Sequence, residues 1–195
     1  MNHTIDPILQ EDLRRIAAGF PHWAELAGKS VLVTGATGLV GSMLVRALCA
    51  APVKITVIAH VRNEQKARAM FGDLPIVYCV GDVTAPVQYP GAVDHILHTA
   101  SVTASKAFVT QPVETLMTAI GGTRNLLEFA RQKKVSSMVY VSSMEAFGIT
   151  DPNLARITEQ DLGYIDILSV RSSYSEGKRI CECLCAAYAS APATR

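Results

Sequence analysis

The 195-residue sequence lacks the features that would place it in a membrane or on nucleic acid. It has no apolar run of about 18 residues, the length that a membrane-spanning helix needs. Its formal net charge is only +1, and its basic residues form no stripe that would bind nucleic acid. The N-terminus carries Asp6, Glu11 and Asp12 and has no apolar stretch typical of a signal peptide. We therefore expect neither a membrane nor a nucleic-acid partner.

Cysteine is sparse, with five in the chain, and three of them crowd the segment ICECLC. On a helix, Cys181 and Cys185 would share a face while Cys183 points away, so the three thiols would not converge on one metal ion. The pattern favours helix packing and predicts no metal site. Free thiols are typical of a reducing compartment, which predicts a cytoplasmic protein.

Strand-like and helix-like segments alternate along the chain, without internal repeats or low-complexity tracts. The strand-like runs are apolar along their whole length, which indicates a parallel sheet covered on both faces. The predicted fold class is therefore α/β, a doubly wound parallel sheet (Rossmann fold), in which ligands bind beyond the carboxyl ends of the strands. The expected strands are 30–34, 54–61, 75–80, 95–100 and 137–143, and the expected helices are 5–18, 39–51, 64–71, 112–133 and 174–189.

The motif TGATGLVG (34–41) lies between the first strand of this alternation and the following helix. Gly35 permits a tight turn, Gly38 lets the backbone approach a pyrophosphate, and Gly41 lets the helix pack closely. The start of the helix offers free N–H groups and a positive dipole to phosphates. We predict dinucleotide binding by Gly35, Thr37, Gly38, Leu39 and Val40.

The G-x-x-G-x-x-G spacing resembles the short-chain dehydrogenase/reductase superfamily, and TGATGLVG is similar to its extended branch, which acts mainly on nucleotide sugars. The resemblance covers about residues 28–190. It implies that Asp82 meets the adenine amino group and that Val83 meets the adenine ring. It also implies a cofactor-lining turn at Thr99, Ala100 and Ser101. One departure is Ala119, which stands where the family commonly has asparagine.

The residues after the second strand decide the form of the cofactor. An NAD site usually has an acid there for the ribose hydroxyls, but this chain has His60, Val61, Arg62 and Asn63. Arg62 favours NADP because it suits a 2′-phosphate, although a solvated loop arginine is an equal alternative. The similarity to nucleotide-sugar enzymes favours NAD, so NAD and NADP both stay open.

The segment RSSYSEGKR (171–179) carries Tyr174 and Lys178, which would share one face of a helix. A neighbouring ammonium favours a phenolate, which makes a tyrosine a better general base near neutral pH. By resemblance, Tyr174 removes the proton of a sugar hydroxyl and Lys178 also binds the nicotinamide ribose. Ser143 would hold the substrate hydroxyl, with Ser142 as the second candidate.

The segment VSSMEAFG (141–148) distinguishes branches of the family by the residues after Ser143. Met144 cannot donate the proton that a 4,6-dehydratase needs there. Glu145 matches the Ser-then-Glu pattern of UDP-glucuronate decarboxylases, which RSSYSEGKR also resembles. We predict that Glu145 handles a proton beside a 4-keto sugar, or alternatively that it braces its own turn.

These observations predict a nucleotide-sugar enzyme of the epimerase, dehydratase or decarboxylase type, with decarboxylation favoured and a lyase or isomerase outcome. Residues 1–27 would form an N-terminal helical extension and residues 28–195 an NAD(P)-binding Rossmann domain. By resemblance, a C-terminal substrate domain is largely absent from this chain, which would then be an inactive fragment. The same resemblance suggests a homodimer. The alternatives are an NADP-dependent reductase of a small carbonyl compound and a non-catalytic dinucleotide-binding module.

Overall fold

The computed structural model describes residues 6–190, which form two compact units. Unit 1 contains residues 6–82, 87–100 and 130–139, and unit 2 contains residues 83–86, 101–129 and 140–190. No helix among these residues has both the length and the apolar character that crossing a membrane requires.

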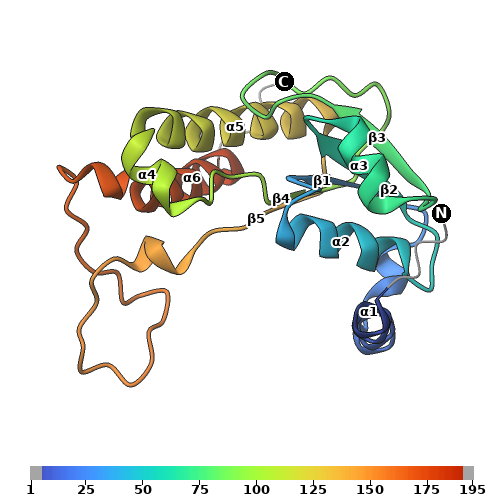
Figure 1. The fold of residues 1–195 in the computed structure, drawn as a ribbon, viewed down its shortest axis with the longest axis horizontal. Helices are drawn as coiled ribbons and strands as arrows, with labels where there is room; N and C mark the ends of the chain where they lie inside the picture. Colours follow the sequence, from blue (N-terminus) through green and yellow to red (C-terminus); the bar gives the residue numbers. More distant parts are fainter. Residues whose placement is uncertain (1–5, 191–195) are drawn as a thin grey trace. The chain divides into compact units, whose positions relative to one another are not determined.

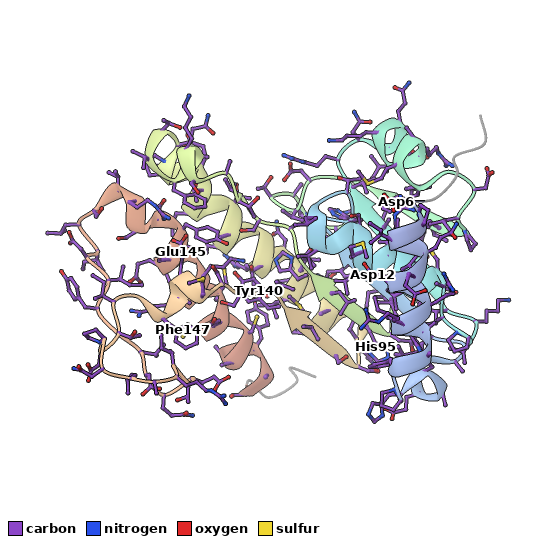
Figure 2. The ribbon with its side chains drawn as sticks, turned by 60° about the horizontal axis from the view of Figure 1, so that its bottom comes forward. Asp6, Asp12, His95, Tyr140, Glu145 and Phe147 are labelled. Carbon is purple, nitrogen blue, oxygen red and sulfur yellow. The ribbon has the colours of Figure 1, made fainter. Side chains whose placement is uncertain are left out.

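A five-stranded sheet with the order β3-β2-β1-β4-β5 forms the centre of unit 1 (Figure 1). β1 runs parallel to β2 and β4, and β2 runs parallel to β3. His95 of β4 and Ser137 of β5 are linked by a hydrogen bond of 2.8 Å (Figure 2). The strands are β1 (Ser30–Thr34), β2 (Thr56–Val61), β3 (Ile76–Val80), β4 (His95–His98) and β5 (Ser137–Tyr140). This order and the flanking helices confirm the predicted α/β fold class.

Burial on both faces explains why the middle residues of the central strands are apolar. Val31 and Val33 of β1 pack into a core cluster with residues of α2 (Leu39–Cys49) and α3 (Glu64–Phe71). Leu32 points to the opposite face and is also fully buried. All five residues of β1 are buried, so neither face of this strand is exposed to water.

The predicted N-terminal helix is present as α1 (Pro7–Gly19), alongside α2 in unit 1 (Figure 1). Asp6 caps it by accepting a hydrogen bond of 2.8 Å from the N–H of Ile8. The following turn, η1 (Trp23–Leu26), buries Trp23, whose indole N–H donates to the carbonyl of Ala17 at 2.9 Å. The division into residues 1–27 and 28–195 stays a prediction.

Unit 2 is mainly helical. It contains α4 (Ser105–Thr110), most of α5 (Pro112–Lys133), the short turns η2 (Met144–Phe147) and η3 (Val170–Ser172), and α6 (Ser173–Ser190). A Cβ at Gly177 of α6 would lie 3.4 Å from the Cβ of Ala119 on α5. Small residues at both positions therefore let the two helices approach closely.

A long irregular segment, 148–169, lies between η2 and η3 in unit 2 (Figure 1). Ile149 and Tyr164 form an antiparallel bridge within it. The guanidinium of Arg179 on α6 donates to the carbonyls of Ala146 at 2.6 Å and of Gly163 at 2.8 Å. Arg179 thus attaches the chain to α6 close to both partners of the bridge, Ile149 and Tyr164.

Four predicted strands are longer than the observed ones: β2 begins at Thr56 and β3 at Ile76, while β4 ends at His98 and β5 ends at Tyr140. Beyond β4, the N–H of Ala100 donates at 3.2 Å to the side-chain hydroxyl of Thr34 in the neighbouring strand β1, which is not a ladder bond to a backbone carbonyl. The chain therefore leaves the ladder although its residues suit a strand. The short helix α4 was not predicted, because six residues carry little periodicity.

The cysteines within residues 6–190 are all free thiols. Cys181 is fully buried, Cys183 is exposed and Cys185 is half-buried, as the predicted helix faces require. The hydroxyl of Thr123 donates to the sulfur of Cys181 at 3.3 Å. The segment ICECLC therefore packs one thiol in unit 2, and no group of three metal-ligating side chains was found among the described residues.

Candidate functional site

The glycine loop of unit 1 has a backbone shape that only glycine accommodates at two positions. Gly35 adopts φ +63°, and a Cβ there would lie 2.8 Å from the backbone of Ala100. A Cβ at Gly41 would lie 2.2 Å from the carbonyl oxygen of Gly35, a contact that no real structure tolerates. The N–H of Gly38 closes the turn by donating to the same carbonyl at 2.8 Å. The turn is therefore tight because Gly35 and Gly41 lack side chains.

The start of α2 suits a phosphate group. Gly38 occupies the N-cap position, and no side chain caps the helix there. The first N–H groups of the helix therefore have no capping acceptor from a side chain, and a helix N-terminus attracts anions. Leu39 and Val40 are 86% and 48% exposed, which leaves an apolar surface beside these groups, while Thr37 is half-buried. The loop fits the pyrophosphate of a dinucleotide.

The predicted adenosine end of the site has mixed charges. Arg62 follows β2 with its side chain 82% exposed, and its Nη1 lies 3.8 Å from a carboxylate oxygen of Asp82. Asn63 is not free to bind ribose, because its side chain caps α3 by accepting from the N–H of Lys66 at 2.8 Å. Burial lowers the pKa of His60, with an opposing effect from Asp82, so this histidine is neutral at pH 7. Arg62 is the cation that unit 1 presents beside Asp82.

The predicted lining residues after β4 also brace unit 1. The hydroxyl of Thr99 donates to the carbonyl of Thr34 at 2.7 Å, and Ala100 bonds to the Thr34 hydroxyl. His98 and Thr34 are linked by a buried hydrogen bond of 2.7 Å. The carboxyl ends of β1 and β4 are therefore tied together, with the glycine loop beside them.

Val83, Ser101 and Lys178 fall in unit 2, whereas the other predicted cofactor residues fall in unit 1. The carbonyl of Val83 accepts from the side chain of Asn125 on α5 at 2.9 Å. A Cβ at Gly122 of α5 would lie 3.0 Å from a methyl group of Val83. Val83 is therefore held against α5, and the hydroxyl of Ser101 bonds to the carbonyl of Val102 at 3.3 Å.

Tyr174 and Lys178 lie on α6 as predicted, one turn apart. The Nζ of Lys178 lies 5.6 Å from the centroid of the Tyr174 ring and donates to the carbonyl of Val141 at 2.7 Å. Lys178 is only 4% exposed, and its burial lowers its pKa. Activation of the Tyr174 phenol by this ammonium stays a prediction.

Two aromatic residues around this pair were missed by the sequence analysis. The ring of Phe108, from α4, stacks on Tyr174 with centroids 4.2 Å apart and planes 7° apart. The Tyr140 ring lies 4.8 Å from the Nζ of Lys178, closer than the Tyr174 ring, and burial raises the pKa of Tyr140 (Figure 2). Tyr140 ends β5 directly before the segment VSSMEAFG, which is the signal that would have located it.

Ser143 and Ser142 have different partners. The hydroxyl of Ser143 caps η2 by accepting from the N–H of Glu145 at 3.2 Å. Among the described residues, its own hydroxyl hydrogen has no acceptor, whereas Ser142 donates to the carboxylate of Glu182. The geometry therefore favours Ser143 over Ser142 for holding a substrate hydroxyl.

Glu145, which is labelled in Figure 2, is held by a bidentate ion pair. Both of its carboxylate oxygens accept from the guanidinium of Arg171 at 2.9 Å, and Ser175 donates to one of them at 3.2 Å. The hydrogen bonds from Arg171 lower the pKa of Glu145, against an opposing effect of burial. Glu145 is therefore ionised at pH 7 and carries no proton that it could donate.

Comparison with known proteins places these features in one family. A model of the NAD dependent epimerase/dehydratase family matches residues 31–195. The chain belongs to this family. The assignment confirms the resemblance to the epimerase/dehydratase branch, and it confirms a nicotinamide dinucleotide as the class of cofactor. The positions that bind it and carry chemistry stay predictions.

Similar proteins include UDP-glucuronic acid decarboxylases. The chain is 31% identical over 163 residues to UDP-glucuronic acid decarboxylase 1 of Xenopus tropicalis, covering 82% of this chain and 37% of that protein. It is 30% identical over 190 residues to the protein of the same name in Danio rerio, covering 92% and 44%. The chain thus spans less than half the length of these two relatives.

Solved structures confirm the fold. A crystal structure of a UDP-galactose 4-epimerase matches with a TM-score of 0.66 and 26% identity, covering 82% of this chain and 51% of that one. A UDP-glucose 4-epimerase from Brucella ovis in complex with NAD matches with a TM-score of 0.68 and 20% identity, covering 86% and 50%. At 20% identity the second likeness concerns the fold alone.

Proposed function

We propose that this chain supplies the cofactor-binding and proton-transfer residues of an enzyme that converts a nucleotide sugar through a transient 4-keto sugar. UDP-glucuronate is the favoured substrate and decarboxylation the favoured outcome. The observation that carries the proposal is the ionised Glu145, two residues after Ser143, in the unit that also holds Tyr174 and Lys178. Similarity to UDP-glucuronic acid decarboxylases supports it.

In unit 1, Gly35, Gly38 and the first N–H groups of α2 would bind the pyrophosphate, with Asp82 or Arg62 at the adenosine. When bound, the nicotinamide would accept a hydride from the sugar and return it to the product. The chain's own residues would hold the sugar and move its protons.

In unit 2, the hydroxyl of Ser143 would hold the sugar hydroxyl at C4, and Tyr174 would take its proton. The buried ammonium of Lys178 would favour the resulting phenolate and bind the nicotinamide ribose. A ketone at C4 makes the C5 carboxylate a β-keto acid, which loses CO₂ and leaves an enolate. The Glu145 carboxylate would then accept a hydrogen bond from the water that protonates C5, because it carries no proton to donate itself.

The proposal is tested by incubating the full-length protein with UDP-glucuronate and NAD⁺ and measuring CO₂ and the UDP-pentose by mass spectrometry. We expect product without net consumption of cofactor. Interconversion of UDP-glucose and UDP-galactose without CO₂ release would replace decarboxylation by epimerisation. Absence of product from all three sugars would contradict the proposal.

A second candidate rests on the exposed Arg62, which suits a 2′-phosphate. It is an NADP-dependent reductase of a small carbonyl compound, which would oxidise one NADPH for each carbonyl reduced. The distinguishing measurement is the loss of NADPH absorbance with a panel of aldehydes and ketones. Stoichiometric loss would favour the reductase over the sugar enzyme.

A further inference from the structure

Arg171 has no role in the proposed chemistry, yet it connects Glu145 and Tyr174, which both have one. It lies in η3, directly before α6, and its side chain is 42% exposed. Its two terminal nitrogens each donate to a different oxygen of Glu145 at 2.9 Å. A bidentate pair of this kind fixes the orientation of the carboxylate as well as its distance.

The same guanidinium packs over an aromatic ring. The central carbon of Arg171 lies 4.7 Å from the centroid of Phe108, which is 2% exposed. Phe108 in turn stacks on Tyr174 at 4.2 Å with nearly parallel planes. The contacts therefore run without interruption from the Glu145 carboxylate through Arg171 and Phe108 to the Tyr174 ring, all within unit 2.

We propose that Arg171 is a positioning residue that fixes the Glu145 carboxylate relative to the Tyr174 ring. This role rests on the proposed function, because it matters only if Glu145 and Tyr174 serve one substrate. Lysine cannot replace it fully, because an ammonium lacks the planar fork that contacts both oxygens and stacks on a ring.

The groups around Glu145 support this assignment. Arg171 from η3 and Ser175 from α6 both donate to the carboxylate, and Arg179 from α6 binds the carbonyl of the next residue, Ala146. Glu145 raises the pKa of Arg171, and Tyr174 adds a smaller effect in the same direction. Of these groups, only Arg171 bonds to both carboxylate oxygens.

The first test needs no substrate. The protein is labelled with ¹³C at the glutamate carboxyl carbons, and the Glu145 signal is assigned by its loss in Glu145→Gln. We expect its titration midpoint to lie below the usual glutamate value of about 4.3. Arg171→Met should move the midpoint upward, Arg171→Lys should move it less, and the exposed Arg156→Met should leave it unchanged. An unchanged midpoint in Arg171→Met would overturn the proposal.

The second test uses turnover of UDP-glucuronate over a range of pH. We expect Arg171→Met to lower kcat about 10- to 100-fold with a smaller change in KM, as misplacement of a reacting group does. The acidic limb of its kcat profile should move to higher pH, and Arg171→Lys should restore part of the rate. Normal kcat and an unmoved limb, with a folded variant, would make the ion pair structural only and overturn the proposal. Absence of turnover in the unsubstituted protein would instead overturn the proposed function itself, and the positioning role with it.

Discussion

Unit 1 shapes its predicted cofactor loop with the backbone, whereas unit 2 fixes its predicted catalytic residues with charged side chains. In unit 1, Gly35 and Gly41 lie so close to neighbouring backbone that no side chain fits. In unit 2, Arg171 holds Glu145 and Lys178 holds the carbonyl of Val141. The predicted cofactor loop depends on backbone shape, whereas the predicted catalytic residues depend on charge as well. Substitutions in the two units should therefore have different effects.

The units also differ in what they bury. The central strands of unit 1 are buried along their length, whereas many large apolar side chains of unit 2 are exposed. Leu168 is 89% exposed, Ile149 is 75% exposed and Ile167 is 73% exposed, all in the segment 148–169. Stability should therefore depend more on unit 1, and chemistry more on unit 2.

The largest effect should come from unit 2. We expect Tyr174→Phe to lower kcat by about 10² to 10⁴, because it removes the proposed proton acceptor. The affinity for NAD⁺, measured by calorimetry, should change little. The exposed Tyr164→Phe in the same unit should retain full activity. Undiminished turnover by Tyr174→Phe would remove this residue from the mechanism.

The next effect should come from the glycine loop of unit 1. We expect Gly41→Ala to weaken NAD⁺ binding by about 10-fold, or ~1.4 kcal/mol. The added Cβ must displace the carbonyl of Gly35, which should also lower the free energy of unfolding by about 1–3 kcal/mol. Gly19→Ala is the control, since a Cβ there would meet nothing within 4 Å. Equal binding by both variants would contradict the backbone argument.

A smaller effect should reveal which cofactor unit 1 prefers. If Arg62 binds a 2′-phosphate, Arg62→Gln should weaken NADP⁺ binding up to about 10-fold and leave NAD⁺ binding within about two-fold. The exposed Arg15→Gln on α1 serves as the control for lost charge. An unchanged ratio of the two dissociation constants would show that Arg62 is a solvated residue.

The smallest effect on activity should separate carboxylates that stabilise the fold from carboxylates that take part in the chemistry. Asp94 accepts from the N–H and the hydroxyl of Ser30, and these bonds lower its pKa. Because the folded pKa is below the unfolded one, its stabilisation is present above about pH 4 and lost as pH falls through the folded value. We expect Asp94→Asn to cost about 1–2 kcal/mol at pH 7 without altering kcat.

Chemical denaturation at pH 7 and pH 2 checks this, with the exposed Asp73→Asn as control. The difference between Asp94→Asn and the native protein should shrink at the lower pH. A reduced kcat in Asp94→Asn would break the division between the two units.

Much of the fold could be predicted from local sequence patterns. The predicted extents of β1, α3 and α5 coincide with the observed ones, because apolar runs and helical spacing directly reflect burial. The predicted strand 137–143 was too long, because a strand ends where its neighbour ends, and the sequence of one segment does not contain that information. The candidate residues Ser143, Glu145, Tyr174 and Lys178 were recognised through spacing and resemblance. Their supporting partners Phe108, Tyr140 and Arg171 were not recognised, since contacts such as that of Arg171 with Glu145, 26 residues away, are made by packing and not by local spacing.

The sequence by itself determined the alternation of strands and helices, the glycine turn and the position of each candidate residue along the chain. These features depend on residues within a few positions of one another, where spacing decides which side chains share a face. Only the tertiary structure decided that Glu145 is an ion-paired carboxylate and that Phe108 stacks on Tyr174. It also decided that Lys178 is buried with its ammonium near the rings of Tyr140 and Tyr174. The physical reason is that ionisation and orientation depend on groups brought together by packing, and Arg171 lies 26 residues from the carboxylate that it holds.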